Sequence, residues 1–174
     1  KTYSLIREPQ IKHVSQLIGE HTRIFLYGFG SSGLAAQEFQ LRLLRLGMDA
    51  EAITELHQMV LNEARITNAC LVIGISLSGA TRELIDALDR AKARGAAVIY
   101  LTSSNAEREK RTYEEIVLAP VKKNLEYGNV ISPQFPILLI LDLIYAQLLK
   151  EDRRSTEAQY DTHIWERIKD YHVG

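Results

Sequence analysis

Hydroxyl and glycine residues gather in two short segments of the sequence. The first is Gly28-Phe29-Gly30-Ser31-Ser32-Gly33, and the second is Ser76-Leu77-Ser78-Gly79-Ala80-Thr81. Each segment follows a short apolar run and opens a run with helical periodicity, so each would present the N–H groups and the positive dipole end of a helix. Hydroxyl groups add hydrogen-bond donors without bulk, and glycines let the backbone approach an anion closely. This chemistry favours a phosphate group as the ligand.

The same residue types have a second interpretation, because serine and threonine at a helix N-terminus are ordinary capping residues. For either segment alone, the two interpretations are equally good. Two such segments at neighbouring strand ends favour an anion site, since independent caps have no reason to lie side by side. The candidate ligands are the hydroxyls and backbone amides of Ser31, Ser32, Ser76, Leu77, Ser78, Gly79 and Thr81.

The first segment also matches the dinucleotide-binding pattern Gly-x-Gly-x-x-Gly, through Gly28, Gly30 and Gly33. Glu51 or Glu55, about 20 residues further on, would then hold the ribose. A nicotinamide or flavin site gives no role to the hydroxyl-rich second segment, however. A dinucleotide-binding domain is therefore the weaker alternative, and we expect no cofactor.

Short β-type runs alternate with longer helix-type runs along the chain. Strands are predicted at Arg23–Tyr27, Asp49–Ile53, Cys70–Ser76, Ala96–Thr102 and Ile116–Ala119. Helices are predicted over about the first 20 residues, and at Leu34–Leu46, Glu55–Arg65, Arg82–Arg94, Pro133 to about Lys150, and Ser155–Tyr171.

This alternation predicts a parallel sheet with helices on both faces. Right-handed crossovers leave few topologies, and we expect an α/β three-layer αβα sandwich whose five strands follow the order 2-1-3-4-5, as in flavodoxin-like folds. Ligands of such sheets bind beyond the carboxyl ends of the strands, where the strand order reverses. Here that point lies between the first and third strands, which are the strands that the two hydroxyl segments follow.

One predicted helix has no clear polar face. Its stretch Ile137–Ile144 is apolar almost all round, so we expect it to be deeply buried or to form a subunit contact. Asp142, inside this stretch, would either face solvent or pair across an interface.

Composition limits the functional class. The chain has 174 residues, 21 Lys+Arg, 22 Asp+Glu and a formal net charge of −1. It therefore lacks the excess of positive charge that is typical of proteins that bind nucleic acids or membrane surfaces. Cys70, the single cysteine, cannot form an internal disulfide, so we expect a cytoplasmic location. Its place in the apolar run Cys70-Leu71-Val72-Ile73 predicts a buried thiol. The apolar run Ile137–Leu141 is too short to span a bilayer, and the histidines show no metal-ligand spacing. We therefore expect no membrane partner and no metal.

The hydroxyl motifs also carry a family resemblance. The stretches Tyr27–Ala36 and Ile73–Glu83 resemble the sugar isomerase (SIS) domain family, through a Ser-x-Ser-Gly-x-Thr element paired with the earlier Gly-x-Ser-Gly turn. Ala91–Ala96, and Ser132-Pro133-Gln134-Phe135 leading into Leu141–Tyr145, are similar to the C-terminal effector domain of RpiR-type bacterial transcription regulators. The resemblance extends from about Ile11 to Leu149.

The resemblance implies a domain that binds phosphorylated sugars and assembles as a homodimer or tetramer, with phosphate-binding positions at Ser32, Ser76, Ser78 and Thr81. In the regulators, a sugar phosphate is an effector that alters DNA binding by an N-terminal helix-turn-helix domain. The chain starts at Lys1 without a methionine. We therefore expect residues 1–174 to be a single SIS domain, a fragment that contacts DNA only through the missing domain.

The expected function is effector binding without catalysis. His57 and Gln134 are the candidates for contacting the sugar. In some related regulators a histidine near the position of His57 contacts the sugar, and Gln134 precedes a helix N-terminus. A solvated surface histidine is an equally good interpretation of His57. The alternative is an aldose–ketose isomerase, which needs a base beside the sugar C1–C2. Its candidates are His57, Glu63, Glu83 and Glu126. The C-terminal Glu and His pattern of the glucosamine-6-phosphate synthase branch is missing here, which weakens this alternative without removing it.

Overall fold

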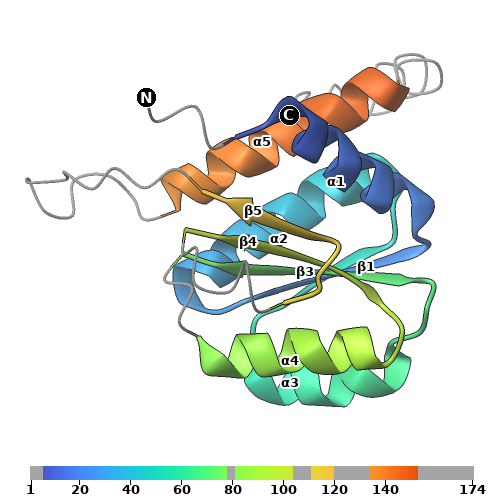
Figure 1. The fold of residues 1–174 in the computed structure, drawn as a ribbon, viewed down its shortest axis with the longest axis vertical. Helices are drawn as coiled ribbons and strands as arrows, with labels where there is room; N and C mark the ends of the chain where they lie inside the picture. Colours follow the sequence, from blue (N-terminus) through green and yellow to red (C-terminus); the bar gives the residue numbers. More distant parts are fainter. Residues whose placement is uncertain (1–5, 78–80, 104–110, 120–133, 153–174) are drawn as a thin grey trace, which may run out of the picture.

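The chain forms a parallel β-sheet with helices on both faces (Figure 1). A computed structural model describes residues 6–77, 81–103, 111–119 and 134–152. The strands are β1 (Arg23–Gly28), β2 (Ala50–Ile53), β3 (Cys70–Ser76), β4 (Ala97–Thr102) and β5 (Glu115–Leu118). The helices are α1 (Glu8–Glu20), α2 (Gly30–Arg45), α3 (Leu56–Asn62), which continues as a 3₁₀ turn over Glu63–Arg65, α4 (Arg82–Ala93) and α5 (Phe135–Asp152).

The strand order is β2-β1-β3-β4-β5, and every neighbouring pair is parallel. The predicted three-layer sandwich and its strand order are therefore confirmed. All seven residues of β3 are buried, because strands and helices enclose it on every side; this explains why its sequence is a continuous apolar run. Since the strands are parallel, all five carboxyl ends lie at one edge of the sheet.

Side chains of each strand alternate between two hydrophobic cores. In β1, Ile24 and Leu26 join the core beneath α1, α2 and α5, while Phe25 and Tyr27 join the core against α3 and α4. Figure 1 shows the same two layers on opposite sides of the sheet. Cys70 is buried in the second core at 2% exposure, as predicted.

Helix α2 begins at Gly30, four residues before the predicted start at Leu34. The reason is local: Gly30 has a φ of +53°, a left-handed conformation that glycine adopts without strain and that turns the chain from β1 directly into the helix. The backbone N–H groups of Ser32 and Gly33 then bond to the Phe29 carbonyl. Ser31 and Ser32 therefore lie in the first turn of α2, and the predicted helix start at Leu34 is wrong.

The apolar stretch of helix α5 is buried on one side only. One side of it, including Ile137, Ile140 and Ile144, is buried in the first core. Asp142 lies on the outer side and pairs with Arg42 of α2 within the same chain, at 2.6 Å. The predicted helix at Ser155–Tyr171 lies outside the described residues.

Candidate functional site

The two hydroxyl segments lie at the same edge of the sheet, after neighbouring strands. β1 pairs directly with β3, and the last residue of β1, Gly28, stands opposite Ile75, one residue before the end of β3. α2 and α4 both begin at this edge, which is on the left in Figure 1. The strand order reverses between β1 and β3, so the point of reversal lies between the two strands where it was predicted.

The first segment is packed tightly against the end of β1. A Cβ atom added to Gly28 would lie 2.9 Å from the backbone of Ser32, and one added to Gly33 would lie 2.8 Å from the Gly28 carbonyl oxygen. These glycines allow the first turn of α2 to sit directly on the strand end. The N-terminal peptide groups of α2 are thus held at the sheet edge, where the positive end of the helix dipole favours an anion.

The two serines of this turn do not cap the helix. The N-cap residue of α2 is Phe29, which makes no side-chain capping hydrogen bond. Ser32 is buried at 8% exposure, and Ser31 is half-buried. Their hydroxyls belong to the first turn itself, beside the end of β1.

In the second segment, hydroxyl groups from its two ends meet. The Oγ atom of Ser76 lies 3.3 Å from Oγ1 of Thr81, although the two residues belong to β3 and to the start of α4. Thr81 is the N-cap residue of α4, and its side chain makes no capping hydrogen bond. The capping interpretation therefore does not explain Thr81, whose hydroxyl faces that of Ser76 instead. Ser78 and Gly79 lie outside the described residues.

Two further hydroxyl residues at this edge escaped the sequence analysis. Ser103, directly after β4, donates a hydrogen bond to the carbonyl of Leu77. Thr54, directly after β2, contacts the first turn of α2, since a Cβ on Gly33 would lie 3.0 Å from its Cγ2 atom. The available signal was positional: each lies at the carboxyl end of a strand of the same parallel sheet, as Gly28 and Ser76 do.

The two residues predicted to contact the sugar, His57 and Gln134, also lie near the edge where the strands have their carboxyl ends. His57 is exposed in the first turn of α3, which follows β2, and no hydrogen bond among the described residues joins it to the hydroxyls. Gln134 is half-buried and its carbonyl accepts a hydrogen bond from the backbone of Leu138 at the start of α5. The structure thus brings together the ends of β1, β3 and β4, while His57 lies in the first turn of α3 and Gln134 directly precedes α5.

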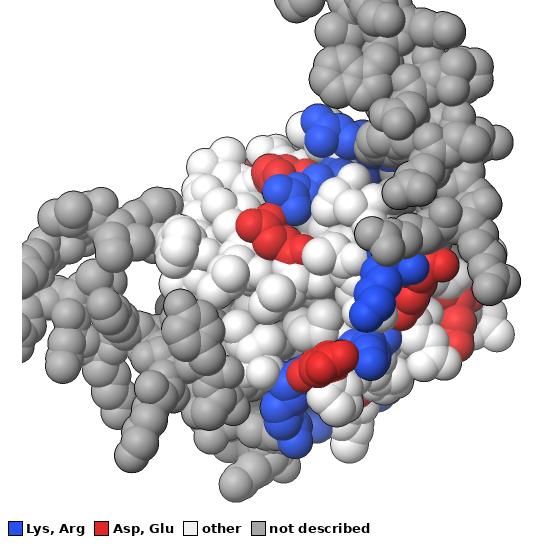
Figure 2. All heavy atoms as spheres, turned by 90° about the horizontal axis from the view of Figure 1, so that it is seen from above, with Lys and Arg blue, Asp and Glu red and all other residues white. Residues whose placement is uncertain are grey.

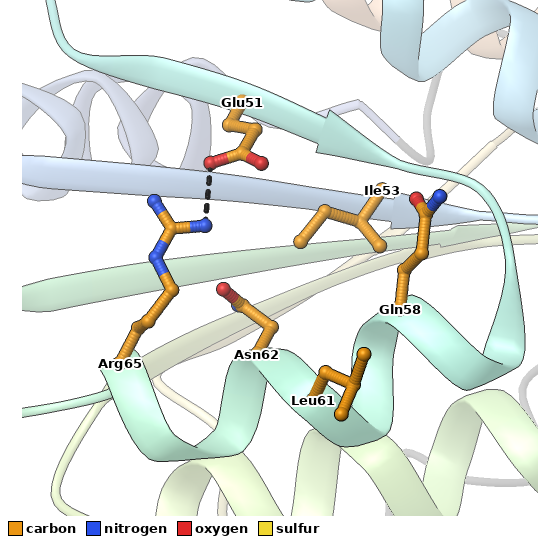
Figure 3. Close-up of a pocket in the computed structure, with 6 residues that line it drawn as sticks. All are labelled: Glu51, Ile53, Gln58, Leu61, Asn62 and Arg65. Carbon is orange, nitrogen blue, oxygen red and sulfur yellow. Dashed lines mark ion pairs between the residues drawn. The ribbon is translucent and has the colours of Figure 1, made fainter.

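A hollow lies beside β2 and α3 (Figure 3). It has a volume of about 310 Å³ and is lined by Glu51, Ile53, Gln58, Leu61, Asn62 and Arg65. Glu51, a candidate ribose ligand of the dinucleotide alternative, is paired with Arg65 at 2.8 Å. That ion pair occupies the carboxylate and removes one support for a dinucleotide site.

No three His, Cys, Asp or Glu side chains in the described part of the chain converge as metal ligands. None of the helices that the structure describes has the length and apolar character needed to cross a membrane.

The sequence of this chain matches a known protein family. The family model of the SIS domain matches residues 16–136. The chain belongs to the SIS domain family. Its matched region contains both hydroxyl segments, so the predicted family resemblance is confirmed.

Relatives of this SIS domain include helix-turn-helix-type transcriptional regulators. One from Haemophilus influenzae is 31% identical over 150 residues, which cover 86% of this chain and 52% of the relative. Another, from Clostridium perfringens, is 32% identical over 137 residues, covering 78% of this chain and 48% of the relative. The chain therefore spans about half the length of these two proteins.

Solved structures show the same fold. The sugar isomerase domain of an RpiR transcription factor from Sphaerobacter thermophilus superposes with a TM-score of 0.77 at 21% identity, over 88% of this chain and 84% of that chain. The Vibrio vulnificus NanR protein, solved in complex with ManNAc-6P, gives a TM-score of 0.79 at 23% identity, over 97% and 62%. Phosphoheptose isomerase GmhA from Neisseria gonorrhoeae gives 0.68 at 18%, over 84% and 88%. The SIS domain is thus similar in fold to regulator domains and also to isomerases.

Proposed function

We propose that this SIS domain binds a phosphorylated sugar where β1 and β3 end, and that it is the effector-sensing domain of an RpiR-type transcription regulator. The observation that carries the proposal is the hydroxyl pair Ser76–Thr81 at 3.3 Å, set beside the buried first turn of α2. Hydroxyls that do not cap their helices, next to two helix N-termini, suit a doubly charged phosphate.

The relatives support the regulatory half of the proposal. Two of them carry helix-turn-helix names and are about twice as long as the matched region, and NanR was solved with an amino-sugar phosphate. The regulator would contact DNA through a helix-turn-helix domain outside residues 1–174 and would act in the cytoplasm. Ligand binding would change the arrangement of a homodimer or tetramer and hence the spacing of its DNA-binding heads.

The test is calorimetric titration with a panel of hexose and amino-sugar phosphates and their unphosphorylated sugars. We expect only phosphorylated sugars to bind. Thr81→Val should weaken binding by about 1–2 kcal/mol, since it removes one charge-assisted hydrogen bond without shortening the side chain. Because the Thr81 side chain makes no capping hydrogen bond, the substitution removes none from the start of α4.

The matched control is Thr112→Val. Thr112 is exposed and precedes β5, so it lies at the opposite edge of the sheet, and the substitution should leave affinity unchanged. Equal affinities of the Thr81 and Thr112 variants would count against the site.

An isomerase is the competing function, because isomerases share the fold. Of its candidate bases, Glu63 is paired with Arg90 at 2.5 Å, and Glu83 is exposed on α4; Glu126 lies outside the described residues. Incubating the purified chain with ketose phosphates and following the aldose signals by NMR separates the two functions. We expect binding without turnover, and turnover lost on replacing His57 would establish the enzyme instead.

A further inference from the structure

The hollow beside β2 exists because the segment after β2 makes its polar contacts with β1. β2 is the edge strand of the sheet, and β1 is its neighbour. Asn62, at the end of α3, donates a hydrogen bond to the hydroxyl of Tyr27 at 2.8 Å. The guanidinium of Arg65 lies 5.1 Å from the centre of the Phe25 ring. Tyr27 and Phe25 both belong to β1, so the face of β2 stays partly open, and the hollow of about 310 Å³ lies there (Figure 3).

Asn62 carries an oxygen atom without a hydrogen-bond partner. The residue lines the hollow and is only 3% exposed. Its Nδ2 atom bonds Tyr27, but its Oδ1 atom is buried and has no partner in the part of the chain that the structure describes. In Figure 3 the carboxamide is directed from α3 into the hollow. A buried carbonyl oxygen that accepts no hydrogen bond is costly and rare in native structures, so this oxygen is suited to accept one from a ligand.

An ion pair stands at the same end of the hollow as Asn62 (Figure 3). Nη1 of Arg65 lies 2.8 Å from Oε2 of Glu51, and both side chains are partly exposed. The pair uses one nitrogen of the guanidinium and one oxygen of the carboxylate, which leaves polar atoms of both groups for a ligand. Because the two charges cancel, a ligand with a single charge would be attracted by one residue and repelled by the other. A ligand with two opposite charges, placed antiparallel to the pair, is complementary to it.

The hollow has the size of a small metabolite. Its volume of about 310 Å³ is near the lower end of the range of ligand pockets, about 300–1,000 Å³. At roughly 30 Å³ for each water molecule, it has room for on the order of ten non-hydrogen atoms. Ile53 and Leu61 line it between the ion pair and Gln58, which lies at the other end (Figure 3). The lining therefore suits a ligand with a doubly charged head and a short apolar tail.

We propose that this hollow binds a free α-amino acid in its zwitterionic form. The carboxylate of the amino acid accepts hydrogen bonds from Arg65, and its ammonium group donates to Glu51 and to Oδ1 of Asn62. Its side chain packs on Ile53 and Leu61. The Arg65 side chain lies beside Asn62 in Figure 3, so a small movement of this long surface side chain uncovers Oδ1. The Glu51–Arg65 ion pair is kept.

The test is calorimetric titration of the whole chain with the common L-amino acids, one at a time and without any sugar phosphate. We expect at least one amino acid with an aliphatic side chain to bind. Its N-acetyl derivative and its carboxamide each lack one of the two charges, so each should bind about tenfold more weakly or less, through the loss of charge-assisted hydrogen bonds. Binding by none of the amino acids, or equal binding by either derivative, overturns the proposal.

Two variants test the location of the site. Arg65→Gln and Glu51→Gln each remove one charge of the ion pair, and each should raise the dissociation constant of the amino acid by about tenfold or more. Partly exposed ion pairs contribute little to stability, so both variants should fold, which circular dichroism verifies. Unchanged affinity in either variant overturns the proposal.

The matched control is Lys12→Gln. Lys12 pairs with Glu8 at 3.0 Å on α1, which covers the opposite side of the sheet (Figure 1). Figure 2 shows that side of the molecule, where basic and acidic side chains lie beside one another in small groups. The variant thus removes the cation of an ion pair far from the hollow and should leave the affinity unchanged, whereas a loss equal to that of Arg65→Gln overturns the proposal. Since no sugar phosphate is present, these outcomes are independent of the proposed function.

Discussion

At the scale of single residues, the candidate site depends on two glycines that contribute no side chain. Gly28 and Gly33 let the first turn of α2 rest on the end of β1, with Thr54 closing the other side. Any Cβ atom at either position would push the helix N-terminus away from the sheet edge. The peptide groups that face the edge are therefore positioned by the absence of side chains as much as by the hydroxyls nearby.

Replacing Gly33 by alanine should destabilise the protein and weaken ligand binding together. The new Cβ would lie 2.8 Å from the Gly28 carbonyl and 3.0 Å from Thr54, so backbone must move, at a cost of about 1–3 kcal/mol in the free energy of unfolding. Urea denaturation measures this cost.

Gly19→Ala is the control for this prediction. Gly19 lies in α1 with nothing within 4 Å of the added Cβ, so the change should stabilise the protein by up to about 1 kcal/mol, through helix propensity. A Gly33 variant as stable as the Gly19 variant would contradict the tight packing.

At the scale of elements, the same close approach holds α4 against β3. Gly74 lies in the middle of β3, and a Cβ there would stand 2.5 Å from Cδ1 and 3.1 Å from Cγ of Leu88. α4 lies this close to the sheet because the strand has no side chain at that point. Both Ser76 and Thr81 belong to this pair of elements, so the distance between their hydroxyls depends on how α4 docks.

A double-mutant cycle at Gly74 and Leu88 tests this docking. Gly74→Ala alone should cost about 1–3 kcal/mol through overpacking, and Leu88→Ala alone about 2–5 kcal/mol through the cavity it leaves. The double variant should lose less free energy of unfolding than the sum of the two single losses, by about 1 kcal/mol or more. The reason is that the added methyl group occupies part of the space that the Leu88 side chain vacates. Equilibrium unfolding in urea measures all three values, and strict additivity would show that the two side chains do not compete for space.

At the scale of the whole molecule, stability and ligand binding are linked. The proposed ligand would contact the ends of β1 and β3 and the starts of α2 and α4, which are elements of both hydrophobic cores. A ligand that requires these ends to be adjacent binds only the folded chain. Occupancy should therefore stabilise the whole sheet rather than one segment.

Thermal unfolding with a bound sugar phosphate measures this linkage. At a free ligand concentration of about 100 times Kd, the free energy of unfolding should rise by about 2.7 kcal/mol. The Thr81→Val variant at the same ligand concentration should show a smaller rise in the free energy of unfolding, because its weaker binding lowers its occupancy. An unphosphorylated sugar that stabilises the native chain equally would refute phosphate as the anchoring group.

The sequence by itself determined the elements and the motif. Short apolar runs, set between stretches of helical periodicity, located every described strand to within a residue or so, because those patterns depend on local geometry. Crossover rules left a few possible strand orders, and 2-1-3-4-5 was the one expected among them. The hydroxyl segments were visible because serine, threonine and glycine gather in them, as an anion site at a helix N-terminus would require.

Only the tertiary structure decided which groups meet. Three contacts depend on sheet register and helix docking. Thr81 faces Ser76 rather than capping α4, Ser103 bonds Leu77, and Asp142 pairs with Arg42 of its own chain. The early start of α2 likewise depends on a glycine conformation and on the fit of a helix turn against a strand end. Such contacts join residues far apart in the chain or depend on a few tenths of an ångström, and neither is encoded in the spacing of residue types along the sequence.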